Sequence, residues 1–123
     1  MILAFHQRSQ IGSIGDNYKA IDDFNRGLGI NPNNAIAHSN RGAVYSDIGD
    51  KHSAINDFNQ AIKLNPNYAK AYYDRAVVRS TIGDKQRAIK DFEKAAVLFR
   101  LQGDLDNYRQ AVNRIGRFDI VAG

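Results

Sequence analysis

The stretch GDKHSAINDFNQAIKLNP, residues 49–66, is written three times in this chain of 123 residues. A copy 34 residues earlier reads GDNYKAIDDFNRGLGINP (15–32), and a copy 34 residues later reads GDKQRAIKDFEKAAVLFR (83–100). Each of these copies matches the middle one at nine of 18 positions, where average composition would give about one match. A fixed period of this length predicts a fold built from repeated structural units.

The middle copy has the pattern of an amphipathic helix with marked ends. Its apolar residues recur at helical spacing and share one face: Ala54, Ile55, Phe58, Ala61 and Ile62. Asp50 is placed to cap the helix N-terminus, and Gly49 before it tolerates the positive φ of a tight turn. Pro66 cannot continue a helix, so the pattern predicts that the helix ends just before it.

The segment before this helix, residues 35–48, also has helical spacing of small and apolar side chains. Gly42 falls in the middle of it, where glycine costs about 1 kcal/mol relative to alanine. The next copy has Ala76 at that position, so the requirement is for a small side chain that lets a neighbouring helix approach. Each unit is therefore predicted to be two antiparallel helices joined by a Gly-Asp turn.

In these features the chain resembles the tetratricopeptide repeat (TPR) family. The residues that carry the resemblance are Gly15, Ala20, Phe24 and Pro32 in the first unit, Gly42, Tyr45, Gly49, Ala54, Phe58, Ala61 and Pro66 in the second, and Ala76, Gly83, Ala88, Phe92 and Ala95 in the third. The resemblance covers about residues 1–100. It implies an all-α fold, a right-handed α-solenoid superhelix of antiparallel helix pairs, with units at about 1–34, 35–68 and 69–102.

The third unit departs from the others at its end, where Arg100 and Leu101 replace Asn65-Pro66. Its second helix is therefore expected to run on to Gln102-Gly103, and Asp104 can cap a last helix at about 104–116. That helix is expected to cover the open face of the array, because a terminal unit would otherwise expose its stacking surface. One face of it is expected to hold Leu105, Tyr108, Val112 and Ile115.

The first unit departs at its beginning. Arg8 stands seven residues before Gly15, whereas Arg41 stands eight before Gly49, and Gly12 falls inside the predicted opening helix. Two interpretations stay open: an irregular, fraying helix, or the abbreviated end of a longer array. In either case we expect this unit to be the least stable part, with a poorly covered face through which the chain could self-associate.

Composition and motifs argue against several functional classes. The chain has no cysteine and a mild net charge of +4, with no apolar run of membrane-spanning length and an opening too short for a signal-peptide core, so we expect a cytoplasmic protein. His6, His38 and His52 lack the spacing of metal ligands, and the glycines lack the context of a phosphate loop. No nucleophile, base and acid form a set. We therefore expect no catalytic, metal or cofactor site.

Arginine recurs at equivalent positions as Arg41 and Arg75, and aspartate recurs every 34 residues as Asp23, Asp57 and Asp91. The arginines could bind an anionic ligand. Recurrent opposite charges in a repeat favour the other interpretation, in which the arginines pair with the aspartates and join neighbouring units.

The resemblance implies that the first helices of successive units line a concave groove that holds an extended peptide or a partner helix. Its expected lining is Ser39, Asn40, Ala43, Asp47, Lys70, Tyr73, Asp74 and Val77, with Ile36, Ser46, Ser80 and Thr81 beside them and Ile2, Phe5, His6 and Ser9 from the first unit. The amide of Asn40 can donate to and accept from a peptide backbone, and Tyr73 offers a rigid contact.

One subset of the family clamps the C-terminal carboxylate of chaperone tails with lysines, asparagines and an arginine. Only Asn40 and Lys70 match that set here; Phe5 and Ser9 replace a lysine and an asparagine, and Asp74 replaces the arginine. Because Asp74 would repel a terminal carboxylate, the sequence favours a neutral or basic segment in the groove.

A competing hypothesis is a nucleic-acid-associated adaptor that uses a basic outer face. Lysines gather on the predicted second helices, the outer layer of such a solenoid: Lys51, Lys63, Lys85, Lys90 and Lys94. The aromatics Phe5, Tyr72 and Tyr73 could stack on bases. The groove itself is not basic, so we favour a non-catalytic protein-interaction module.

Overall fold

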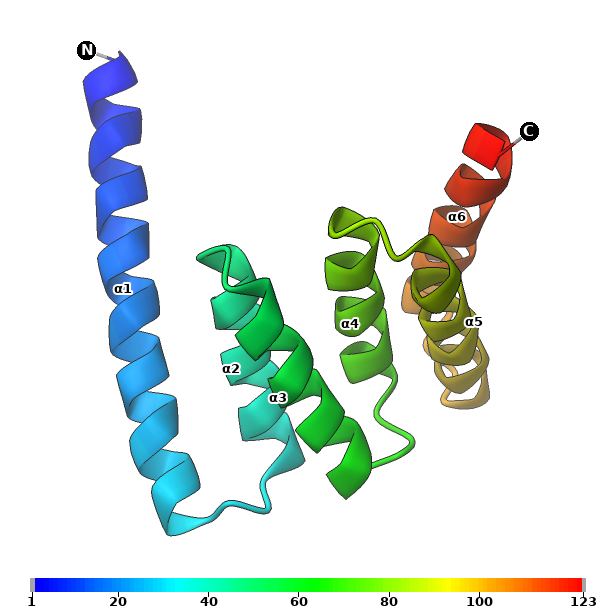
Figure 1. Cartoon of the computed structure of the whole chain (residues 1–123), viewed down its shortest axis with the longest axis horizontal. Helices are drawn as coiled ribbons and strands as arrows, with labels where there is room; N and C mark the ends of the chain where they lie inside the picture. The colour runs from blue at the N-terminus through cyan, green and yellow to red at the C-terminus, as the bar shows by residue number, and fades with distance from the viewer. Residues whose placement is uncertain (1, 123) are drawn as a thin grey trace.

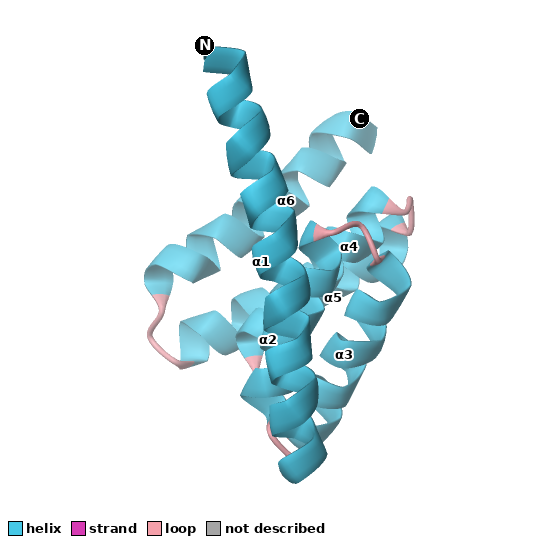
Figure 2. Cartoon of the chain, turned by 90° about the vertical axis from the view of Figure 1, so that its left-hand side faces the viewer, coloured by secondary structure: helices cyan, strands magenta, loops and turns pink. Residues whose placement is uncertain are grey.

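The structure, a computed structural model, describes the backbone of residues 2–122 and the side chains of residues 14–118. This part of the chain forms helices joined by short loops and contains no strand (Figure 2). The helices are α1 (Ile2–Ile30), α2 (Ala35–Asp47), α3 (Lys51–Leu64), α4 (Ala69–Thr81), α5 (Lys85–Leu101) and α6 (Leu105–Ala122). The predicted all-α fold is confirmed.

Two helix pairs, α2 with α3 and α4 with α5, form the middle of the molecule. Each pair is joined by a turn in which a glycine has a φ of +85°: Gly49 in the first and Gly83 in the second. The following aspartates, Asp50 and Asp84, accept hydrogen bonds from backbone N–H groups three residues on and so cap α3 and α5. The predicted Gly-Asp turns are present in both pairs because only glycine adopts this conformation without strain.

The pairs stack side by side in chain order (Figure 1). α3 packs against α4 between the pairs, α1 packs against α2 at one end, and α6 packs against α5 at the other. α2 also touches α4 directly. The first helices, α2 and α4, therefore lie in one row, and the second helices, α3 and α5, lie in the other.

Phe58 and Phe92 are the largest side chains buried almost completely. Phe58 packs with Ala54 of its own helix and Val78 of the next unit, as the repeat pattern predicts. A Cβ added to Gly42 would lie 2.9 Å from the Phe58 ring. The small residue expected at this position is thus required by the close approach of α3 to α2.

The first unit differs from the sequence prediction. α1 is one continuous helix of 29 residues, and the turn expected at Gly15-Asp16 is not formed. Its C-terminal half takes the place of a second helix, with Ile21 and Leu28 buried. A helix that is one residue short has its apolar face rotated by about 100° relative to the turn, so folding back would bury less apolar surface than in the other units.

The last helix is longer than predicted, and its buried face is different. Asp104 caps it by accepting from the Asn107 N–H, as expected. Leu105 and Val112, however, are 51% and 41% exposed. The inward face holds Tyr108, Ala111, Ile115 and Phe118, about a quarter-turn of the helix away from the face predicted.

Candidate functional site

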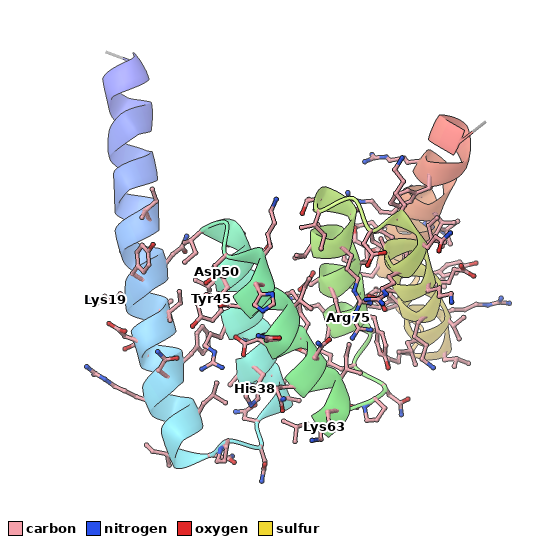
Figure 3. The ribbon with its side chains drawn as sticks, in the orientation of Figure 1. Lys19, His38, Tyr45, Asp50, Lys63 and Arg75 are labelled. Atoms are coloured by element: carbon pink, nitrogen blue, oxygen red, sulfur yellow. The ribbon has the colours of Figure 1, made fainter. Side chains whose placement is uncertain are left out.

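The recurrent arginines form ion pairs inside each helix pair. Arg41 on α2 donates from Nε and an η nitrogen to both carboxylate oxygens of Asp57 on α3, at 2.8 and 2.6 Å. Arg75 on α4, labelled in Figure 3, makes the same bidentate contact with Asp91 on α5, at 2.8 and 2.7 Å. The structural pairing is confirmed for these two arginines. Asp23, the third aspartate of the predicted set, is exposed on α1 and forms no ion pair with another residue whose side chain the structure describes.

The remaining η nitrogen of each arginine reaches back to the preceding unit. Arg41 donates to the Asn25 side chain on α1 at 2.9 Å, and Arg75 donates to Asn59 on α3 at 2.8 Å. Asparagines 34 residues apart therefore carry the link between units, which the sequence prediction had given to the aspartates. Hydrogen bonding to Asp57 raises the pKa of Arg41, against the opposing effect of burial.

Three hollows lie along the row of α2, α4 and α6, and together we call them the groove. The first, of about 290 Å³, lies between α2 and α4. It is lined by Ala43, Ser46, Asp47, Phe58, Lys70, Asp74 and Val77. Five of the eight residues predicted from the sequence therefore come together here: Ala43, Asp47, Lys70, Asp74 and Val77.

The second hollow, of about 440 Å³, shares Lys70 and Asp74 with the first and extends past Tyr73 to the start of α6. Asparagines from the loop after α3, Asn65 and Asn67, line it as well. The third, of about 220 Å³, lies between α4 and α6. It is lined by Tyr73, Gln110, Asn113, Arg114 and Arg117. The second hollow thus adjoins the first at Lys70 and Asp74 and the third at Tyr73.

Ser39 does not line the groove. It is completely buried, and its hydroxyl has no hydrogen-bond partner among the described residues. It lies one helical turn before Gly42, on the face of α2 that α3 approaches most closely. The prediction that Ser39 contacts a partner is wrong for this reason.

Tyr73 belongs to both the groove and the core. Its ring packs edge-on against Phe92 and Phe99, with centroid distances of 5.3 and 6.4 Å, while the same residue lines two of the hollows. The sequence predicts Tyr73 only as a groove residue, and the structure shows that it also packs against the core. Its position is equivalent to that of Ser39, which explains why both side chains are directed inward.

Asn40 is half-buried on α2 and does not line these three hollows. Its contact with a partner stays a prediction. The first-unit residues predicted for the groove are Ile2, Phe5, His6 and Ser9; their side chains lie outside the described residues.

Asp74 is the most perturbed acid of the groove. Burial raises its pKa, Lys70 lowers it, and Asp47 raises it further. The Lys70 ammonium lies 3.8 Å from the Asp74 carboxylate and is more than half exposed, so it only partly compensates the charge. The centre of the groove is therefore a place where a cation from a partner would be favoured.

The sequence prediction considered only the apolar face of α6 and missed its polar face. Gln110, Asn113, Arg114 and Arg117 fall at i, i+3, i+4 and i+7, one stripe of a helix. This helical spacing of polar residues is the sequence signal from which the polar face could have been predicted. The predicted outer lysines, Lys51, Lys63, Lys85, Lys90 and Lys94, are all exposed on α3 and α5.

Within the residues whose placement is described, no helix is long and apolar enough to cross a membrane. Over the same residues, no three His, Cys, Asp or Glu side chains gather closely enough to hold a metal ion.

His38 on α2 donates a hydrogen bond from Nε2 to the Pro32 carbonyl at 2.8 Å. Tyr72, at the equivalent position, donates to the Pro66 carbonyl at 3.0 Å, so this position connects its helix to the preceding loop in both units.

Comparisons with known proteins agree with the stacked helix pairs. Family models described as tetratricopeptide repeat match residues 35–68 and 58–90. A solved structure of the second TPR domain of human RPAP3, in complex with the HSP70 peptide SGPTIEEVD, is 30% identical, with a TM-score of 0.74. The match covers 85% of this chain and 82% of that one. The chain belongs to the tetratricopeptide repeat family.

Two further TPR structures are similar, both from Spaghetti (RPAP3) and both bound to the HSP90 peptide SRMEEVD. The first TPR of that protein is 26% identical, with a TM-score of 0.78 over 96% of this chain and 90% of the other. The second TPR is 33% identical, with a TM-score of 0.66 over 68% and 78%. No curated protein matched the chain. The predicted TPR solenoid is thus confirmed.

Proposed function

We propose that the chain is a non-catalytic interaction module that binds an extended peptide segment along the groove. The hollow between α2 and α4 carries this proposal. Ala43 and Val77 leave room for a peptide there, and Asp47 and Asp74 give it negative charge. The peptides bound by the RPAP3 domains support the same mode of binding, since those domains share the fold and the repeat sequence.

The chemistry of the segment is proposed to differ from that of those peptides. SRMEEVD and SGPTIEEVD each end in two glutamates, a valine and an aspartate. The family resemblance implies that Asp74 stands where the chaperone-tail clamp has an arginine, and Asp47 lines the same hollow as Asp74. Because two carboxylates repel acidic side chains, we expect a neutral or basic segment where the peptide crosses α2 and α4.

A peptide panel tests this proposal. Three fluorescent peptides share one neutral backbone sequence and carry two lysines, two alanines or two glutamates in the middle. Fluorescence anisotropy should rank their affinities in the order lysine, alanine, glutamate. Asp47→Lys should reverse the order without affecting folding, because Asp47 is exposed. Asp22→Lys, an exposed aspartate of α1 outside the hollows, is the matched control.

The proposal fails if none of the peptides binds, or if the affinity order is the same in the wild type and in Asp47→Lys. The competing hypothesis is nucleic-acid binding by the outer lysines, which are exposed along α3 and α5. It predicts binding of single-stranded oligonucleotides that falls steeply with salt. That binding would be lost in Lys90→Glu, Lys94→Glu, two exposed positions outside the groove.

A further inference from the structure

The α6 end of the groove is built differently from its centre. Arg114 and Arg117 line the hollow between α4 and α6. They also line an adjoining hollow of about 180 Å³, together with Ser80, Lys85, Phe92 and Phe118. We propose that this end is a subsite for an acidic residue next to a large apolar one in the same bound peptide. This inference rests on the proposed function, since it concerns the same groove.

The cations of this subsite are available to a ligand. The arginines of the helix pairs are held by carboxylates: Arg41 by Asp57, and Arg75 and Arg79 by Asp91. In the described part of the chain, no acidic residue forms an ion pair with Arg114, Arg117 or Lys85. No acid lines either of the two hollows. A carboxylate placed there would gain charge-assisted hydrogen bonds from arginine without displacing an existing partner.

The adjoining hollow is suited to a single apolar side chain. Its floor is aromatic, formed by Phe92 and Phe118 with ring centroids 6.2 Å apart. Its volume of about 180 Å³ is below the roughly 300–1,000 Å³ of small-molecule sites. An aromatic or leucine side chain could enter it while the cations at its rim bind a neighbouring carboxylate.

The hollow between α2 and α4 and the hollow between α4 and α6 thus have opposite charge. The hollow between α2 and α4 contains Asp47 and Asp74, and the hollow between α4 and α6 contains Arg114 and Arg117. Packed helices lie about 8–10 Å apart, and an extended peptide rises about 3.3 Å per residue. The two hollows flank α4 and are thus one helix spacing apart, so the basic and acidic positions of the ligand should be separated by about three residues. A nucleic acid would meet the two aspartates with its phosphates, which is why a peptide is favoured.

The test uses the full chain and a bipolar probe peptide with a fluorescent label. The probe carries two lysines, a spacer of about one or two small neutral residues, and then a phenylalanine and two aspartates. A second probe has the reverse order, since either direction is compatible with the groove. The variant Arg114→Glu, Arg117→Glu should bind the better of the two probes about tenfold more weakly or worse. Arg109→Glu is the matched control, an exposed arginine of α6 outside both hollows.

Replacing the two aspartates of the probe by lysines should restore binding to the charge-reversed variant, which loss of folding would not allow. The inference is overturned if the arginine variant binds the bipolar probe as tightly as the wild type does, while Asp47→Lys still weakens it; the proposed function then stands. If neither probe binds the wild type, the proposed function fails and this inference with it. Tighter binding of a single-stranded oligonucleotide than of the probe, lost in the arginine variant, would also overturn it.

Discussion

Tyr73 connects the groove to the core, so its substitution should affect folding as well as binding. Removing the ring in Tyr73→Ala takes away its edge-on contacts with Phe92 and Phe99. We expect the free energy of unfolding to fall by about 2–4 kcal/mol, measured by urea denaturation. Tyr73→Phe, which keeps the ring, is the control and should lose less than half as much. An unchanged midpoint for Tyr73→Ala would contradict the packing described for this residue.

Asp74 should make stability depend on pH. Burial raises its folded-state pKa above the unfolded value, so the ionised carboxylate destabilises the fold at neutral pH. This cost is fully present above the folded-state pKa. It declines as the pH falls toward the unfolded-state pKa of about 3.9. Asp74→Asn should therefore raise the melting temperature at pH 7.

The gain from Asp74→Asn should shrink as the pH is lowered and vanish near pH 3.5, below the unfolded-state pKa. Thermal melts from pH 3.5 to pH 8 measure it. Asp22→Asn, at an exposed position of α1, should show no such trend. A variant that is less stable at neutral pH would mean that the contact with Lys70 outweighs the cost of burial.

The sequence predicted residue roles best where the repeat constrains both partners. Arg41 and Arg75 recur with Asp57 and Asp91 at a constant spacing, so their pairing could be predicted. The burial of Ser39 and the core contacts of Tyr73 could not be predicted. At the edge of a helix face, a few tens of degrees of rotation decide whether a side chain points inward or outward. The groove-lining face of α6 was missed because α6 departs from the 34-residue register.

At the scale of helices, Gly49 and Gly15 show how a turn differs from a continuous helix at equivalent positions of the repeat. Gly49 has a φ of +85°, whereas Gly15 is helical and an added Cβ would meet nothing within 4 Å. Gly49→Ala should cost about 1–2 kcal/mol. Gly15→Ala should stabilise α1 by up to about 1 kcal/mol. Circular dichroism and thermal melting measure both; destabilisation by Gly15→Ala would indicate that a turn forms there after all.

Most helix boundaries could be read from the sequence because each is marked by a turn glycine, a capping aspartate or a proline. α1 is the exception. Its Gly-Asp pair is present at residues 15–16, but such a pair specifies a turn only when the two flanking helices can bury each other. Local signals alone could not show that this tertiary contact is missing.

For the whole molecule, stability should depend on contacts between neighbouring units. Phe58 is completely buried and packs with Val78 of the next unit. Phe58→Ala should lower the free energy of unfolding by about 3–5 kcal/mol. Units two and three should lose their joint unfolding transition, because a repeat array is coupled only through its neighbours. A shift of the melting temperature by only a degree or two would contradict this packing.

The N-terminal part should be the least protected. The first half of α1 does not fold back as a helix pair, so its amide hydrogens are expected to exchange before those of α2 to α5. Hydrogen exchange measured by mass spectrometry would show this, and uniform protection along the chain would contradict it. Self-association through this region stays a prediction; sedimentation showing a monomer at high concentration would exclude it.

The arginine links also set how the array can deform. Each guanidinium forms a bidentate ion pair inside its own helix pair but only a single hydrogen bond to the asparagine of the preceding helix. Under a bending load the hydrogen bond to the asparagine should break first, since one hydrogen bond to a neutral amide is weaker than a bidentate pair of hydrogen bonds to a carboxylate. The array should therefore be stiff within each helix pair and compliant between neighbouring pairs. The curvature of the array can then adapt to the width of a bound partner, while each helix pair keeps its own conformation.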